Sequence, residues 1–72
     1  MDGVDARLFR ALKQKLGSEE RAKSSIILMG LMEKLSRKRT EASKKQIEEI
    51  KSNFEEFVGI SYRNFENLID ML

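Results

Sequence analysis

The side chains best suited to bind a ligand are cations that gather between residues 34 and 45. The cluster comprises Lys34, Arg37, Lys38, Arg39, Lys44 and Lys45, and three more cations lie near the start of the chain, at Arg7, Arg10 and Lys13. Contact with nucleic-acid phosphates requires several mobile cations along one surface. Cations in the last turn of a helix also complement the helix dipole and its free carbonyl groups. The sequence alone leaves both interpretations open.

Catalytic chemistry has few candidates here. The chain holds no His and no Cys, which removes the usual zinc ligands, the commonest general base and the thiol nucleophile. A chain of 72 residues also has little room for a ligand pocket of a few hundred Å³. We therefore expect a protein that is not an enzyme, with no catalytic residue, no metal site, no cofactor and no small-molecule substrate.

The charges are unevenly distributed along the chain. Its net charge is only +2, yet residues 1–39 carry ten Lys or Arg against five Asp or Glu, a net of +5. Residues 40–72 carry four against seven, a net of −3. This asymmetry predicts a basic contact face, attraction between subunits, or pairing of the two halves within one chain.

The most apolar segment is the run Ile26–Met32, which contains no polar side chain. Seven such residues cover every face of two helical turns, so we expect this segment to be surrounded, either as the central element of a small bundle or as part of an interface. Gly30 would let one of them cross closely, and the adjacent methionines would suit a groove for a partner helix. The run is far shorter than the roughly 20 residues that span a bilayer. With no signal-peptide pattern at the start, we expect a cytoplasmic protein without membrane association.

Four helices are predicted from apolar periodicity and capping residues. The first runs from about Val4 to Leu16 and ends at Gly17. The second begins after the N-cap Ser18 and ends at Arg37 or Lys38. The third carries the apolar stripe Ile47, Ile50, Phe54 and Phe57 and ends at Gly59, while the fourth follows Ser61 and presents Tyr62, Phe65, Leu68, Ile69 and Leu72.

The boundary between the second and third helices is the least defined. No Gly or Pro occurs between Leu31 and Val58, so one long helix is an alternative. The scarcity of apolar residues in 36–46 and a change in stripe phase favour a turn near Arg39–Ala42. Either Thr40 or Ser43, the latter with Gln46, would then cap the third helix.

The predicted fold is a single all-α domain over residues 1–72, a small bundle of four short helices with the second at its centre. A domain of this size buries only about 60% of the surface of its unfolded chain, and without Cys no disulfide can compensate. We therefore expect a protein partner, most simply a second copy, so that dimerisation completes the core.

The predicted function is that of a small regulatory or adaptor protein acting through helix-mediated protein–protein contact. The residues expected to line the interface or the adjoining core are Ile26, Ile27, Met29, Met32, Phe54 and Phe57. The alternative is a small nucleic-acid-binding regulator that uses the basic N-terminal half and the cluster at 34–45. Its contact residues would be Arg7, Arg10, Lys13, Lys34, Arg37, Lys38, Arg39, Lys44 and Lys45.

Overall fold

Four α-helices make up residues 6–72, the part of the chain that the computed structural model describes. They are α1 (Ala6–Leu16), α2 (Glu19–Lys38), α3 (Glu41–Val58) and α4 (Tyr62–Met71), and this range contains no strand. The all-α prediction and the number of helices are confirmed. Val4, where the first helix was expected to begin, lies outside the described residues.

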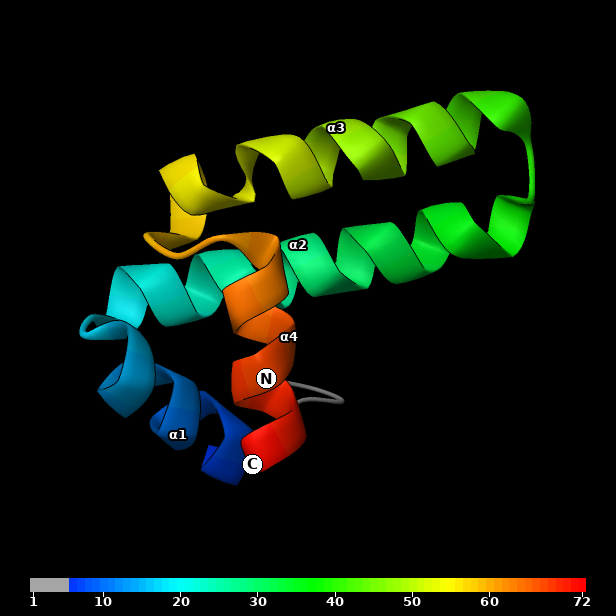
Figure 1. Cartoon of the computed structure of the whole chain (residues 1–72). Helices are drawn as coiled ribbons and strands as arrows, with labels where there is room; N and C mark the ends of the chain where they lie inside the picture. Colours follow the sequence, from blue (N-terminus) through cyan, green and yellow to red (C-terminus); the bar gives the residue numbers. More distant parts are fainter. Residues whose placement is uncertain (1–5) are drawn as a thin grey trace.

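The two long helices α2 and α3 form an antiparallel hairpin, and the two short helices pack against one end of it (Figure 1). α2 contacts both α1 and α3, and α4 contacts α3. The second helix is therefore central, as predicted. The other end of the hairpin, where α2 turns into α3, extends beyond α1 and α4 (Figure 1).

Most helix ends carry the capping residues that the sequence predicted. The Oγ atoms of Ser18 and Ser61 accept hydrogen bonds from the backbone N–H groups of Arg21 and Asn64, at 3.1 Å and 3.3 Å. Gly17 and Gly59 have φ values of 91° and 87°. These left-handed conformations favour glycine and end α1 and α3.

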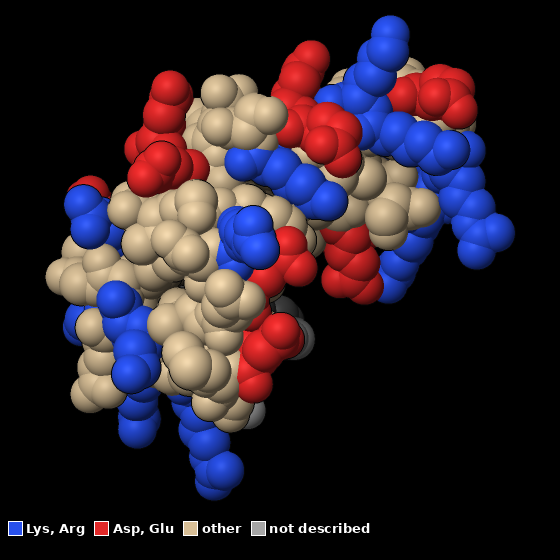
Figure 2. Space-filling view, in the orientation of Figure 1, with Lys and Arg blue, Asp and Glu red and all other residues tan. Residues whose placement is uncertain are grey.

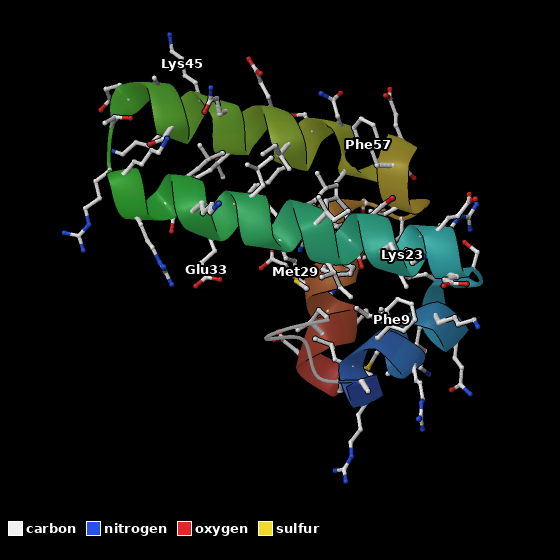
Figure 3. All side chains as sticks on the ribbon, turned by 180° about the vertical axis from the view of Figure 1, so that it is seen from behind. Phe9, Lys23, Met29, Glu33, Lys45 and Phe57 are labelled. Atoms are coloured by element: carbon white, nitrogen blue, oxygen red, sulfur yellow. The ribbon has the colours of Figure 1, made fainter. Side chains whose placement is uncertain are left out.

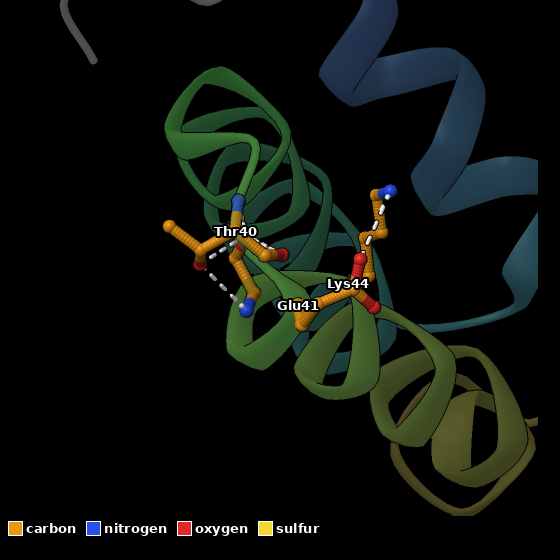
Figure 4. A network of polar contacts seen from close by, with 4 residues as sticks. Thr40, Glu41 and Lys44 are labelled. Atoms are coloured by element: carbon orange, nitrogen blue, oxygen red, sulfur yellow. Dashed lines mark hydrogen bonds and ion pairs between the residues drawn. The ribbon is translucent and has the colours of Figure 1, made fainter.

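The α2–α3 turn consists of Arg39 and Thr40, and a capping box at the start of α3 stabilises it (Figure 4). Thr40 Oγ1 accepts a hydrogen bond from the Ser43 N–H at 3.1 Å, and Ser43 Oγ accepts one from the Thr40 N–H at 3.1 Å. Thr40 is thus the cap and Ser43 lies inside the first turn, so the pairing of Ser43 with Gln46 is wrong. The turn at the predicted place also excludes one long helix.

The core is centred on Phe54, which is fully buried. The centroid of its ring lies 5.3 Å from the centroid of the Tyr62 ring, in an edge-to-face arrangement. It lies 4.9 Å from the centroid of the Phe65 ring. Around these rings all four helices contribute buried apolar side chains, which are Leu12, Leu16, Ala22, Met32, Phe54, Val58 and Phe65. One continuous core therefore holds both short helices to the hairpin.

The other described helices cover the apolar run at 26–32 on some of its sides only, so the expectation that the bundle alone surrounds it is wrong, and its place in an interface stays a prediction. Met32 is buried, but 67% of Ile27 and 44% of Leu31 are exposed. Gly30 is exposed as well, and a Cβ atom added there would meet nothing within 4 Å. No described helix therefore crosses α2 at Gly30. The reason is that α3 and the short helices cover two sides of α2 and leave a third open.

Replacing Phe54 with Ala should lower the free energy of unfolding by about 3–5 kcal/mol, because it empties the centre of the core. Phe57 is the matched control, since it lies on the same helix with 58% of its surface exposed, and Phe57→Ala should cost less than about 1 kcal/mol. Urea unfolding followed by circular dichroism at low protein concentration measures both. Phe54→Leu preserves the comparison if the alanine variant does not fold. Equal losses for Phe54→Ala and Phe57→Ala would contradict this description of the core.

Replacing Gly30 with Ala should raise the free energy of unfolding by about 0.5–1 kcal/mol, because alanine lowers the entropy cost of ordering a helix interior. The added methyl group enters open space, so no steric cost opposes the gain. The same unfolding measurement tests this change. A loss of stability would show that another segment packs against α2 at this position.

Candidate functional site

An apolar groove runs along the hairpin between α2 and α3, and we call it the α2–α3 groove. Its main hollow has a volume of about 360 Å³ and is lined by Leu28, Leu31, Leu35, Gln46, Glu49, Ile50, Asn53 and Phe57. A second hollow of about 170 Å³ is lined by Ser24, Ile27, Leu28 and Phe57. Since Leu28 and Phe57 border both hollows, the two form one continuous surface.

The spacing of residues along both helices produces this groove. On α2 the lining residues fall at positions 24, 28, 31 and 35, with Ile27 beside them, and on α3 at positions 46, 50, 53 and 57, with Glu49 beside them. Steps of four, three and four residues keep side chains on one helical face. Two matching rows of side chains, one on each helix, therefore form the groove. The row on α3 shares Ile50 and Phe57 with the apolar stripe whose Phe54 enters the core.

Among the described residues, this groove holds three of the five large apolar side chains that are exposed, and the other two are Met71 and Leu72 at the end of α4. Ile27, Leu31 and Phe57 are 67%, 44% and 58% exposed, yet they lie on one surface together. Monomeric soluble proteins rarely leave large apolar side chains exposed side by side, and such patches mark interaction sites. Figure 3 shows Phe57 on α3, with Met29 on another side of α2, where Met29 borders residues of α4.

The six residues predicted for the interface and adjoining core separate into three groups. Met32 and Phe54 belong to the buried core, and Ile26 and Met29 are partly buried against it. Ile27 and Phe57 lie on the groove. The sequence reasoning missed Leu28, Leu31, Leu35 and Ile50 as groove residues. Their shared spacing with Ser24 and Phe57 is the signal that would have revealed them.

The two predicted groups of basic residues lie at different ends of the hairpin, because α1 packs at the end opposite the α2–α3 turn (Figure 1). Figure 2 shows Lys and Arg side chains at the α2–α3 turn and again around α1, with uncharged and acidic side chains and some further basic ones between. Arg7, Arg10 and Lys13 belong to the α1 group and are exposed. The structure therefore does not join them to the cluster at 34–45 in one surface.

Some charges in the cluster at 34–45 are already paired within their helices. Arg37 contacts Glu33 at 2.7 Å and Lys44 contacts Glu41 at 3.6 Å, both at exposed positions. The other four cations form no ion pair with any described residue, and they are Lys34, Lys38, Arg39 and Lys45. The turn thus carries several cations that are available to an anionic partner.

Over residues 6–72 the structure shows no set of side chains arranged for metal binding. In this range no group of three or more His, Cys, Asp or Glu side chains is placed so that it could hold a metal ion. Every buried side-chain nitrogen or oxygen in it has a hydrogen-bond partner, and buried Ser25, for example, donates to the Ala22 carbonyl at 2.7 Å. None of the four helices combines the length and the apolar character that a membrane crossing requires.

No family model, curated protein or solved structure matches this chain significantly. The arguments for its function therefore come from the α2–α3 groove and from the basic cluster at the turn.

Proposed function

We propose that this chain is a small regulatory or adaptor protein without enzymatic activity, and that it acts by helix-mediated protein–protein contact at the α2–α3 groove. The observation that carries the proposal is the exposure of Ile27, Leu31 and Phe57 on one continuous apolar surface. The side chains that line the groove are spaced four and three residues apart on each of two antiparallel helices. A partner helix can pack along the surface that these side chains form.

The energetics favour occupation of this groove. Full burial of a Leu, Ile or Phe side chain is worth about 1.5–3 kcal/mol relative to leaving it exposed. A partner that covers the three exposed residues therefore gains several kcal/mol before the costs of association. Glu49 borders the groove on α3, and Gln46 and Asn53 lie in it beside Ile50 and Phe57, so the surface combines apolar and polar side chains as protein interfaces do.

Photo-cross-linking in the cells that make the protein tests the proposal. A photoreactive phenylalanine analogue placed at Leu31 should form cross-links to protein, because this position faces the occupant of the groove. The same analogue at exposed Asn67 on α4 is the matched control and should give only background. Adding Phe57→Glu should remove the cross-link at position 31. Equal yields at the two positions would overturn the proposal, whatever protein is captured.

A second candidate function, binding of nucleic-acid backbone, is supported by the unpaired cations at the α2–α3 turn. Lys34, Lys38, Arg39 and Lys45 form no ion pair within the described chain, and the turn extends beyond the short helices (Figure 1). Four cations on a projecting turn suit contact with phosphates.

Titration with mixed-sequence duplex DNA at several salt concentrations tests this second candidate. The logarithm of the binding constant should fall with the logarithm of salt concentration, with a slope of about −0.9 for each phosphate contacted. The double variant Lys38→Gln, Arg39→Gln should reduce the magnitude of that slope by about two. Arg63→Gln on α4 is the control and should leave it unchanged. The absence of binding at low salt would exclude this function.

A further inference from the structure

We propose that the occupant of the α2–α3 groove is an amphipathic helix of another protein, acidic at one end and basic at the other, which binds with its acidic end nearest the α2–α3 turn. The inference rests on the proposed function, because it uses the same groove, and it adds the chemistry and the direction of the partner. It follows from the order of charges along the groove and from the absence of ion pairs among them.

Three charged residues on α2 form one border of the groove, which we call the α2 rim. Glu20 precedes Ile27 by seven residues, and Lys34 and Lys38 follow Leu31 by three and seven. Side chains at these spacings lie on one side of a helix, so the rim residues flank the exposed apolar ones. All three charged side chains are exposed.

Three charged residues on α3 form the opposite border, the α3 rim. Glu49 lines the groove directly. Lys45 precedes it by four residues and Glu56 follows it by seven, so both lie on the same side of α3. These three side chains are exposed as well. Figure 3 shows Lys45 near the turn and Phe57 near the other end of α3.

The charges of both rims follow the same order along the groove. Since a helix rises about 1.5 Å per residue, the distance of each residue from the turn follows from its position in the sequence. Glu49 lies about 14 Å from the turn, and Glu56 and Glu20 lie about 24 Å and 29 Å from it. The cations all lie within about 8 Å of it, and they are Lys34, Lys38 and Lys45. The groove is therefore basic at the turn and acidic at its other end, on both helices.

The rim charges also differ from most other charges on the hairpin in having no partner. None of the six rim residues forms an ion pair with a described residue. Arg39 at the turn and Glu55 form none either. Eight other charged residues of the hairpin are paired within their own helix, and the pairs are Glu19–Lys23, Glu33–Arg37, Glu41–Lys44 and Glu48–Lys51. Unpaired charges in a fixed order suit a partner that carries the opposite order.

A single partner helix satisfies both rims when its acidic end lies nearest the turn. Its carboxylates then face the three lysines, and its cations face the three glutamates. Its apolar side chains enter the main hollow of about 360 Å³ between the two rows of lining residues. Acidic residues stabilise a helix at its N-terminus and basic residues at its C-terminus. The partner that best meets both conditions therefore begins near the turn and runs antiparallel to α2.

A second copy of this chain fits the same charges less well. If groove faces groove, a two-fold axis along the hairpin exchanges the rims and keeps each residue at its level. That axis sets Glu20 beside Glu56 and Lys38 beside Lys45. A two-fold axis across the middle of the hairpin keeps each rim on itself and reverses the levels, which sets Glu49 beside Glu49 of the other copy. Like charges meet in both arrangements, which costs free energy, whereas a single helix is under no such constraint.

The first experiment titrates the purified protein with two synthetic peptides at low ionic strength. Both have 20 residues, like α2, with Leu at steps of four and three, and the same hydrocarbon staple on the far face makes them equally helical. One peptide has Glu in its N-terminal half and Lys in its C-terminal half, and the other has the same residues in alternation. The segregated peptide should bind about tenfold more tightly, and added salt should reduce the difference.

Two protein variants show whether this binding uses the groove. Phe57→Glu should abolish the binding of both peptides. Met71→Glu is the matched control, because Met71 is 77% exposed outside the groove, and it should bind like the wild type. Equal affinity for the two peptides, or no binding of either near millimolar concentration, would overturn the inference.

The second experiment determines the direction of the bound peptide by nuclear magnetic resonance. A nitroxide at the acidic end of the segregated peptide should broaden the amide signals of residues 38–42, and one at the basic end should broaden those of residues 18–21. A peptide with its two halves exchanged should bind in the opposite direction, so that its acidic end, now C-terminal, still lies nearest the turn. If the direction does not follow the charges, the inference is wrong.

Exchanging the rim charges of the protein should reverse the direction of the peptide. The variant carries Lys34→Glu, Lys38→Glu, Glu20→Lys and Glu56→Lys, and its helical spectrum shows whether it folds. Exchange of a pair outside the groove, Glu33→Lys with Arg37→Glu, is the matched control and should leave the direction unchanged. The peptide with exchanged halves keeps the test decisive if the rim variant does not fold.

Failure of this inference and failure of the proposed function give different results. If position 31 cross-links to protein in cells but the peptides bind without a preferred direction, charge does not select the partner and the interaction function stands. If the cross-linked product is a dimer of this chain, the occupant is a second copy, so the inference is wrong and the function again stands. The absence of cross-links specific to position 31 refutes both.

Discussion

The mismatch in length between the helices is the constraint on which the rest of this structure depends. α2 and α3 have 20 and 18 residues, whereas α1 and α4 have 11 and 10. A helix rises 1.5 Å per residue, so the two short helices are too short to cover the full length of the hairpin. They pack at one end, around Phe54, Tyr62 and Phe65, and the core they complete is small. One face and the turn end of the hairpin stay uncovered.

The uncovered face and the uncovered turn differ in what they can bind. The face exposes Ile27, Leu31 and Phe57, so the hydrophobic effect favours a partner there. The turn exposes Lys38 and Arg39, whose attraction to anions is screened by salt. The interaction function is preferred because apolar burial supplies affinity, whereas the charges at the turn mainly set orientation and the rate of encounter.

The capping signals show how much of the fold can be predicted from local sequence. Ser18, Ser61, Gly17 and Gly59 act as the pattern indicated, because capping depends on residues three or four apart. The α2–α3 turn was harder to define, since Arg39 takes the left-handed position, with a φ of 53°, where glycine is usual. Thr40 and Ser43 were both acceptable caps by type, and only their hydrogen bonds distinguish them.

The amino-acid sequence by itself determined that residues 6–72 form four helices in this order, with an apolar run on the second and an apolar stripe on the third. It did not determine which of those apolar residues are enclosed. Phe54 and Phe57 are three residues apart in one stripe, yet the first is the centre of the core and the second is exposed. The tertiary structure alone decides this, because periodicity defines the faces of a helix but not the neighbours that cover them. The groove therefore became visible only when the short helices were found at one end of the hairpin.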